Sequence, residues 1–366
     1  MHSNRHLWDE IISDDNIMKA IVEASRGKTK REDFKIILQR SDEDNISYFR
    51  FLAYHYTGDE EEYQHKYVYI HDGISNKRRR LIKPTADEQI LHHMVMIVVR
   101  RVILRSKYIY AIGSVPNAGC HYGKSVVESW IRKGGKDIKY CLKMDIKKFF
   151  DSVDQNILIK IIQTKIQDKE TLRLLISIIH CVPTGLPLGL YTSPWLAHLL
   201  LEPLDRFIKE VLKVKYYIRY VDDMVIFGSS NKILHKVFNN INDLMTNEYK
   251  LQIKENWQIF RFDYIDKNSQ RKGRPVDFLG FQFYRDKVIL RRKIYFRIIR
   301  LINDMRKVDK SSIYQIRKFM SYLGWLDYTD TYNFYLTYIK PFIDIKSMKK
   351  RISNYDRRIS KSILNV

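Results

Sequence analysis

Residues 216–228 read Tyr-Tyr-Ile-Arg-Tyr-Val-Asp-Asp-Met-Val-Ile-Phe-Gly, in which two largely apolar runs flank a pair of adjacent acids. Aromatic and β-branched residues favour strands, so the pattern predicts a β-hairpin whose tight turn carries Asp222 and Asp223. Turns favour aspartate for its hydrogen bonds to nearby backbone, and a solvated turn is therefore the simplest interpretation. Two neighbouring carboxylates repel each other, however, and a divalent cation relieves that repulsion. The hairpin is therefore a candidate metal site.

The bulk composition bounds the class of protein. The chain has 366 residues, enough for two or three domains, and 45% of them are hydrophobic, which excludes wholesale disorder. The longest uncharged segment, residues 174–201, is broken by prolines and glycines and is not a membrane span. The first six residues lack the apolar region of a signal peptide, and the three cysteines are scattered. These features predict a cytoplasmic protein with no membrane partner.

The strongest bulk signal is positive charge. The formal net charge is +23, from 65 Lys and Arg against 42 Asp and Glu, and residues 291–366 hold about half of this excess. A basic chain with 25 Tyr and 17 Phe favours a polyanionic partner, with nucleic acid ahead of an acidic membrane surface. Generic basicity without a dedicated partner is the alternative.

Hydrophobic periodicity gives the expected order of elements. Residues 67–71 and 77–83 predict a basic hairpin, which suits phosphate contacts or, alternatively, a solvated sheet edge protected by its charges. The other expected elements are helices over 7–26, 31–41, 87–105, 126–132, 154–181, 194–201, 232–249 and 294–366, strands over 138–145, 251–254 and 257–262, a hairpin of 276–283 with 288–292, and polar or Gly-rich connections over 42–59, 113–123 and 263–274.

Two segments would bring further groups to the hairpin. Residues 138–145 alternate with period two, which places Asp145 at the end of a strand on its polar face, where it could meet Asp222 and Asp223. A Gly/Pro loop from Gly185 then leads into an apolar helix, which Thr192 or Ser193 can cap with Pro194 in its first turn.

Two other motifs fail on spacing. Gly119 with Gly123-Lys124-Ser125 has one residue too few for a phosphate-binding loop. No His or Cys pair has zinc-ligand spacing, so these residues are expected to pack in the interior: His92, His93, Cys120, His121, His180 and Cys181.

The order of elements, together with its motifs, resembles a reverse transcriptase (RNA-directed DNA polymerase) of the bacterial and phage lineage that includes group II intron, retron and diversity-generating retroelement enzymes. The resemblance is carried by Asp145-Ile-Lys-Lys-Phe-Phe150-Asp-Ser-Val-Asp154, Gly185-Leu-Pro-Leu-Gly189 with Thr192-Ser193-Pro194, Tyr220-Val-Asp-Asp223, and Asp277-Phe-Leu-Gly280-Phe281.

The resemblance implies an α+β, right-hand polymerase fold with fingers, a palm of antiparallel sheet plus helices, and a helical thumb. The implied domains are a helical N-terminal extension over 1–66, fingers over 67–136, a palm over 137–290 with fingers-side helices near 155–184, and a basic helical thumb over 291–366.

The resemblance also implies the chemistry. Such an enzyme joins a 3′-hydroxyl to an α-phosphate with two Mg²⁺ ions, for which Mn²⁺ can substitute, and hard oxygen ligands suit these ions. The implied metal ligands are Asp145, Asp222, Asp223 and the carbonyl of Ile146, and the three aspartates are the catalytic residues.

Further roles follow from the same resemblance. Phe150 matches the aromatic gate against a ribose 2′-hydroxyl, with ordinary core packing as the alternative. Lys254 matches a proton donor to pyrophosphate, and Lys250 is a near rival. The remaining nucleotide-binding candidates are Arg78, Arg80, Lys83, Leu188 and Gly189, and the primer or template candidates are Tyr220, Ser193, Phe278, Leu279 and Gly280.

The expected partners are an RNA template, a DNA or RNA primer, dNTPs, a cognate structured non-coding RNA and an accessory protein. Leu188 resembles diversity-generating enzymes, although these usually carry Ser-Gln where this chain has Ser193-Pro194. Asn117-Ala118-Gly119-Cys120-His121 resembles retron enzymes, although these mostly use Tyr-Ala-Asp-Asp and a Val-Thr-Gly in the thumb, and neither appears here. The implied role is therefore phage defence or a diversity-generating retroelement. The alternatives are an RNA-templated RNA polymerase, a template-independent or protein-primed polymerase in antiphage defence, and a non-catalytic RNA-binding scaffold.

Overall fold

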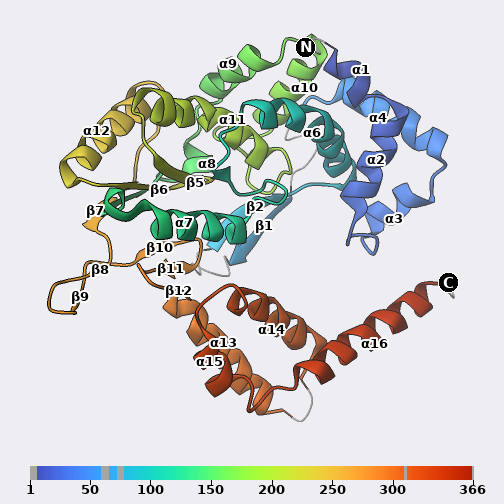
Figure 1. Ribbon diagram of the computed structural model, residues 1–366. Helices are drawn as coiled ribbons and strands as arrows, with labels where there is room; N and C mark the ends of the chain where they lie inside the picture. Colours follow the sequence, from blue (N-terminus) through green and yellow to red (C-terminus); the bar gives the residue numbers. More distant parts are fainter. Residues whose placement is uncertain (1–5, 59–65, 72–77, 309–310, 365–366) are drawn as a thin grey trace. The chain divides into compact units, whose positions relative to one another are not determined.

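The structure is a computed structural model that describes residues 6–58, 66–71, 78–308 and 311–364 (Figure 1). The chain forms two compact units, each built from two segments. The first unit comprises Met1–Gly119 and Tyr140–Ile259, and the second comprises Cys120–Lys139 and Phe260–Val366. Both mix helices with strands, so the predicted α+β class is confirmed.

A five-stranded sheet organises the first unit. Its order is β3-β5-β6-β4-β7, with β3 parallel to β5 and the β5–β6 and β6–β4 pairs antiparallel. The central strands are buried on both faces, which explains their nearly continuous apolar sequence. The strands are β3 (Ala111–Ile112), β4 (Tyr140–Asp145), β5 (Tyr216–Tyr220), β6 (Asp223–Gly228) and β7 (Gln258–Arg261), the last of which leads into the second unit.

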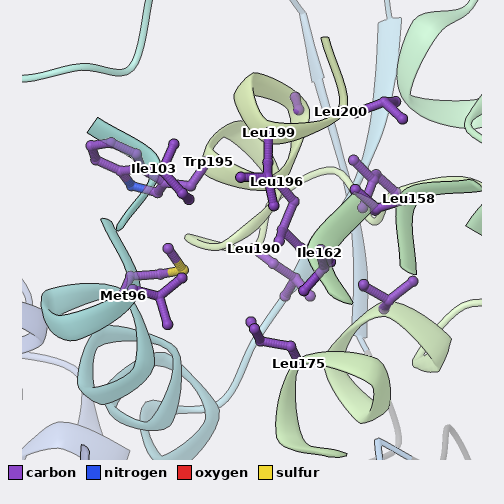
Figure 2. Close-up of a cluster of buried hydrophobic side chains, with 14 of the residues drawn as sticks. Met96, Ile103, Leu158, Ile162, Leu175, Leu190, Trp195, Leu196, Leu199 and Leu200 are labelled. Atoms are coloured by element: carbon purple, nitrogen blue, oxygen red, sulfur yellow. The ribbon is translucent and has the colours of Figure 1, made fainter. Parts of the chain in front are cut away.

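The helices of the first unit form its hydrophobic core. Thr85 and Glu88 make a capping box that starts the long helix α6. Figure 2 shows side chains from α6, α9, α10 and α11 meeting in one cluster, including Met96, Leu158 and Trp195. These helices are α6 (Ala86–Ser106), α8 (Phe149–Ser152), α9 (Gln155–Lys165), α10 (Lys169–His180), α11 (Ser193–Arg206) with its π-helical extension Phe207–Val211, and α12 (Asn231–Asn247).

Four helices lie in the described part of the N-terminal region, residues 6–58, and the sequence analysis missed one of them. Residues 42–59 were expected to be a polar connection, yet α4 (Asp42–His55) fills most of that range. Ser41 caps this helix through the Asp44 amide, and its three first-turn acids complement the helix dipole, while Phe49 and Ala53 are buried. The other helices are α1 (Leu7–Ile11), α2 (Asp14–Ser25) and α3 (Glu32–Gln39).

The predicted basic hairpin is confirmed. It consists of β1 (Lys66–His71) and β2 (Arg78–Lys83), paired antiparallel, and its turn lies outside the described residues. Arg78 stacks over Tyr69 and Arg80 over Tyr67, with guanidinium-to-ring distances of 3.9 and 3.6 Å.

The second unit contains small sheets and helices. Residues 276–283 are not one strand, because Leu279 and Gly280 both have positive φ and turn the chain back on itself. Cys120–Gly123, expected in a loop, is helical. The elements are α7 (Cys120–Gly134), a 3₁₀ turn (Gly135–Asp137), β8 (Tyr264–Ile265), β9 (Arg271–Lys272), β10 (Val276–Phe278), β11 (Phe281–Phe283), β12 (Val288–Leu290), α13 (Arg292–Arg306), α14 (Ile313–Leu326), α15 (Tyr332–Tyr338) and α16 (Ile345–Leu364).

Among the described residues, none of the helices combines the length and the apolar character that a bilayer crossing requires.

Candidate active site

The three candidate aspartates come together at one end of the central sheet. Asp145 ends β4 directly opposite Asp223, the first residue of β6. Directly paired residues in an antiparallel ladder have Cα atoms about 4.5–5.5 Å apart and side chains on one face. Asp222 lies in the turn that precedes β6, so the turn carries Val221 and Asp222 and not both acids as predicted. Two segments that are some 80 residues apart in sequence therefore supply neighbouring carboxylates.

Asp222 and Asp145 interact electrostatically. Burial, followed by the nearby charge of Asp145, raises the pKa of the Asp222 carboxyl to about 7. Burial and a neighbouring negative charge both disfavour the ionised form, and a nearby cation would offset both effects.

Two lysines form ion pairs with these acids. The Lys254 ammonium is 2.5 Å from Asp145 Oδ2, and its backbone amide also donates to the Asp145 carbonyl. Lys143, two residues before Asp145 on the same strand, is 3.6 Å from Asp223 Oδ2. Lys250, the rival candidate for the Lys254 position, instead pairs with Asp154.

The residues present fit hard divalent cations. Asp145 Oδ1 is buried with no hydrogen-bond donor among the described residues, as expected of an atom that awaits a ligand. The donor set is made of carboxylate oxygens, and Ile146 follows directly on β4 with its side chain buried. In the described part of the chain, no three acidic, His or Cys side chains are grouped so that they could hold a metal ion. Lysines contact two of the acids, Asp145 and Asp223.

The turn between β5 and β6 is unusual at Val221. Its φ is +56°, a conformation that costs a β-branched residue on the order of 1–3 kcal/mol. Its amide donates to the Ile112 carbonyl at 3.1 Å, and its carbonyl accepts from Arg219 at 2.8 Å. Gly113 makes room beside it, since a Cβ there would lie 3.0 Å from the Val221 side chain.

The loop from Gly185 is attached to the segment that carries Phe150. The Leu186 amide donates to the Phe150 carbonyl at 2.7 Å, and Gly185 has φ +77° with no room for a Cβ, which would lie 2.5 Å from that carbonyl oxygen. Gln155 holds the start of the loop, because its side-chain nitrogen lies within 3.1 Å of the carbonyl oxygens of Ile179, Val182 and Gly185 and shares its two hydrogens among them. Gln155 was missed by the sequence analysis, since a glutamine in the first turn of a helix has no distinguishing pattern.

The other end of the same loop contacts the basic hairpin. The Ile82 amide of β2 donates to the Leu188 carbonyl at 2.8 Å, and a Cβ on Gly189 would lie 2.2 Å from the Ile82 carbonyl oxygen. Gly189 therefore has a structural role in this close backbone approach. A cavity of about 300 Å³ lies here, and its lining includes Tyr67, Arg80 and Leu188. Arg78, Arg80 and Lys83 all have exposed side chains.

The primer and template candidates occupy different environments. Tyr220 is half-buried at the end of β5, opposite Asp223. Ser193 is buried and donates to the Pro187 carbonyl at 2.5 Å, while Thr192 is the N-cap residue of α11 without a side-chain capping bond. In the second unit, Phe278 is fully buried and Leu279-Gly280 forms the turn of the β10–β11 hairpin, where the Arg291 amide donates to the Gly280 carbonyl.

Comparisons with known proteins relate the chain to reverse transcriptases and to proteins encoded by introns. Residues 81–283, more than half of the chain, match the family model described as reverse transcriptase (RNA-dependent DNA polymerase). The group II intron-encoded protein LtrA of Lactococcus lactis subsp. cremoris is 28% identical over 159 residues, which cover 41% of this chain and 26% of that protein. A COX1/OXI3 intron 2 protein of Saccharomyces cerevisiae is 24% identical over 136 residues, which cover 33% and 15% of the two chains.

The chain thus spans about a quarter of the length of the bacterial relative that it matches. Among solved structures, it is similar to telomerase from Candida albicans in complex with a TWJ fragment of telomeric RNA, with a TM-score of 0.45 and 12% identity. That match covers 80% of this chain and 59% of the telomerase chain.

Proposed function

The chain belongs to the reverse transcriptase family, and from that premise we propose that it synthesises DNA on an RNA template by two-metal nucleotidyl transfer. The observation that carries the proposal is the direct pairing of Asp145 with Asp223, with Asp222 in the adjoining turn. Family membership supports a dependence on divalent metal, and the buried oxygen donors fit Mg²⁺, with Mn²⁺ as a substitute.

In this proposal, Asp145, Asp222 and Asp223, with the carbonyl of Ile146, hold two ions. Bound ions of this kind activate the attacking 3′-hydroxyl and stabilise the leaving pyrophosphate. Lys254 protonates the pyrophosphate, a role supported by its contact with Asp145 and by the engagement of Lys250 elsewhere.

The loop and hairpin described above would receive the nucleotide. Arg78, Arg80 and Lys83 grip the triphosphate, which their exposed charges support, and Leu188 contacts the base from the wall of the cavity. Gly189 allows the close packing of the hairpin on this loop, and Phe150 excludes the 2′-hydroxyl of a ribonucleotide by its bulk.

The domain layout is proposed as a right hand. It comprises a helical extension over 1–66, fingers over 67–136, a palm over 137–290 and a basic thumb over 291–366. Tyr220, Ser193, Phe278, Leu279 and Gly280 form or support the path of primer and template, with buried Ser193 and Phe278 acting through the backbone that they hold. The thumb helices would contact duplex backbone and 2′-hydroxyls without reading sequence.

The proposed biological role is in phage defence or a diversity-generating retroelement, in the cytoplasm of a bacterium or as a phage-encoded enzyme. The proposed partners beyond template and primer are a cognate structured RNA and an accessory protein.

Primer extension tests the proposal. Purified protein is given Mg²⁺, labelled dNTPs or rNTPs, and primed RNA or no template. We expect templated DNA synthesis that Asp145→Asn and Asp222→Asn abolish while RNA binding persists; Asp243→Asn, at an exposed acid on α12, is the control.

Extension retained by Asp145→Asn would refute the assignment of the acids. Product without a template would identify a template-independent polymerase, and RNA binding with no product in any condition would identify a scaffold.

A further inference from the structure

A charged cluster lies buried behind the hairpin that carries Asp222. The side chains of Arg219 and Asp205 are both fully buried and form a two-point ion pair, with nitrogen-to-oxygen distances of 2.5 and 2.8 Å. The Tyr217 hydroxyl, also buried, donates to the same carboxylate at 2.7 Å. Asp205 comes from α11, whereas Arg219 and Tyr217 come from β5.

Stability alone does not account for this cluster. Taking two charges out of water costs free energy that their attraction barely returns, and well-packed apolar residues often replace such pairs without loss. Their sequence neighbours Leu204 and Ile218 are fully buried, so a Leu or Met is compatible with both positions. The function of Arg219 should therefore be sought in the contacts that it makes outside the ion pair.

The third contact of Arg219 is with the turn. Its remaining terminal nitrogen donates to the Val221 carbonyl at 2.8 Å, immediately before Asp222. The Val221 amide is bound on the other side by the Ile112 carbonyl of β3, so both backbone polar groups of this strained residue are engaged. β3 itself is fastened by Lys107, which donates to the Ala111 carbonyl at 2.7 Å.

We propose that Arg219 is a positioning residue whose guanidinium, fixed by Asp205, holds the Val221 carbonyl and so keeps the strained turn that directs Asp222 and Asp223 toward Asp145. The inference rests on the proposed polymerase function, because only in that function must the turn hold Asp222 and Asp223 near Asp145. Five donors in a rigid planar fork let arginine serve the carboxylate and the carbonyl together, which a lysine ammonium does not do in this geometry.

The test removes the whole cluster without leaving a buried charge or hydroxyl unpaired. The triple variant Asp205→Leu/Tyr217→Phe/Arg219→Met is compared with the wild type, and Val221→Gly is introduced into both backgrounds. Glycine adopts positive φ without steric cost, so it keeps the turn without the brace. Circular dichroism and thermal unfolding establish that each variant is folded.

We expect the folded triple variant to lose about 10²-fold in kcat, since small misplacements of catalytic groups have effects of that size. KM for dNTP changes little. Val221→Gly should raise kcat of the triple variant by about tenfold or more. Its effect on kcat of the wild type should be much smaller, because the two sites are coupled.

Two measurements need no turnover. In calorimetry, we expect the triple variant to bind Mn²⁺ more weakly than the wild type, and Val221→Gly to restore the affinity. Amide hydrogen exchange over residues 219–224 should be faster in the triple variant and slower again once Val221→Gly is added. If the wild type binds Mn²⁺ in this way but makes no product, the proposed function fails while the inference about the turn stands.

Either of two results would overturn the inference. One is a folded triple variant with wild-type kcat and Mn²⁺ affinity, which would leave Arg219 with a structural role only. The other is an equal effect of Val221→Gly in both backgrounds.

Discussion

At the scale of single residues, Phe150 is the residue that we propose as a steric gate. Its ring is half-buried and stands edge-on to the buried ring of Phe149, with centroids 5.2 Å apart. We expect Phe150→Ala to raise ribonucleotide incorporation relative to dNTPs by about 10–100-fold, since removing bulk opens room for one oxygen. Single-nucleotide extension with matched rNTP and dNTP measures this ratio. Phe150→Tyr, which keeps the bulk, is the control, and unchanged selectivity in Phe150→Ala would exclude the gate.

Lys254 and Lys250 can be compared directly as candidates for the proton donor. Both pair with an aspartate, but the partner of Lys254 is Asp145 and the partner of Lys250 is Asp154, the cap of α9. Lys254→Gln is expected to lower kcat by about 10²-fold or more through loss of the proton donor. Lys250→Gln leaves kcat nearly unchanged. Pre-steady-state incorporation over a range of pH distinguishes the two, and equal losses would remove the special role of Lys254.

At the scale of elements, Gly189 joins the β1–β2 hairpin to the loop from Gly185. Gly189→Ala places a Cβ 2.2 Å from the Ile82 carbonyl oxygen and also strains φ of +109°. Gly27→Ala is the control, because Gly27 has φ of +72° with open space around it. We expect Gly27→Ala to cost about 1 kcal/mol and Gly189→Ala about 1–3 kcal/mol more in the free energy of unfolding, measured with denaturant.

A displaced hairpin should also weaken nucleotide binding, so KM for dNTP rises in Gly189→Ala and not in Gly27→Ala. An equal effect of the two changes on stability and KM would show that the close approach is unimportant.

The sequence predicted local patterns well and long-range contacts poorly. The β1–β2 hairpin, the strand ending at Asp145 and the start of a helix near residue 154 were all confirmed, because hydrophobic periodicity is a local signal. Residues 251–254 were expected to be a strand but form only a single bridge at Ile253.

The contacts that hold the site were not predictable from patterns. The Asp205–Arg219 pair joins residues 14 positions apart, and charged residues in amphipathic segments normally face solvent, so nothing local marks them as buried. The lysine contacts to Asp145 and Asp223 likewise depend on how the strands pair.

At the scale of the whole molecule, we expect the buried His198 and the half-buried His93 to make the free energy of unfolding depend on pH. Burial, and then the charge of Arg219, lower the pKa of His198 to about 3, while its Nε2 contacts the Gly113 carbonyl; burial and Lys28 lower the pKa of His93 to about 4. Below about pH 6.5 the unfolded chain binds protons at these sites that the folded chain does not, so stability falls as pH falls from 6.5 toward 4.

Each histidine contributes up to about 1.4 kcal/mol per pH unit in that window. His198→Gln, which keeps a donor for Gly113, should therefore flatten the pH dependence of the unfolding free energy. His235→Gln, at an exposed ring, is the control, and an unaltered slope in His198→Gln would contradict the prediction.

The short loop between Gly185 and Gly189 connects the segment that carries Phe150 to the basic hairpin. One backbone hydrogen bond ties Leu186 to Phe150, and another ties Leu188 to Ile82, with a single residue between the two attachment points. We therefore expect a displacement of the basic hairpin to displace the segment that carries Phe150 as well. For the roles proposed for Phe150 and the hairpin, we therefore expect sugar discrimination and phosphate binding to be coupled, so that a change that loosens either attachment weakens both.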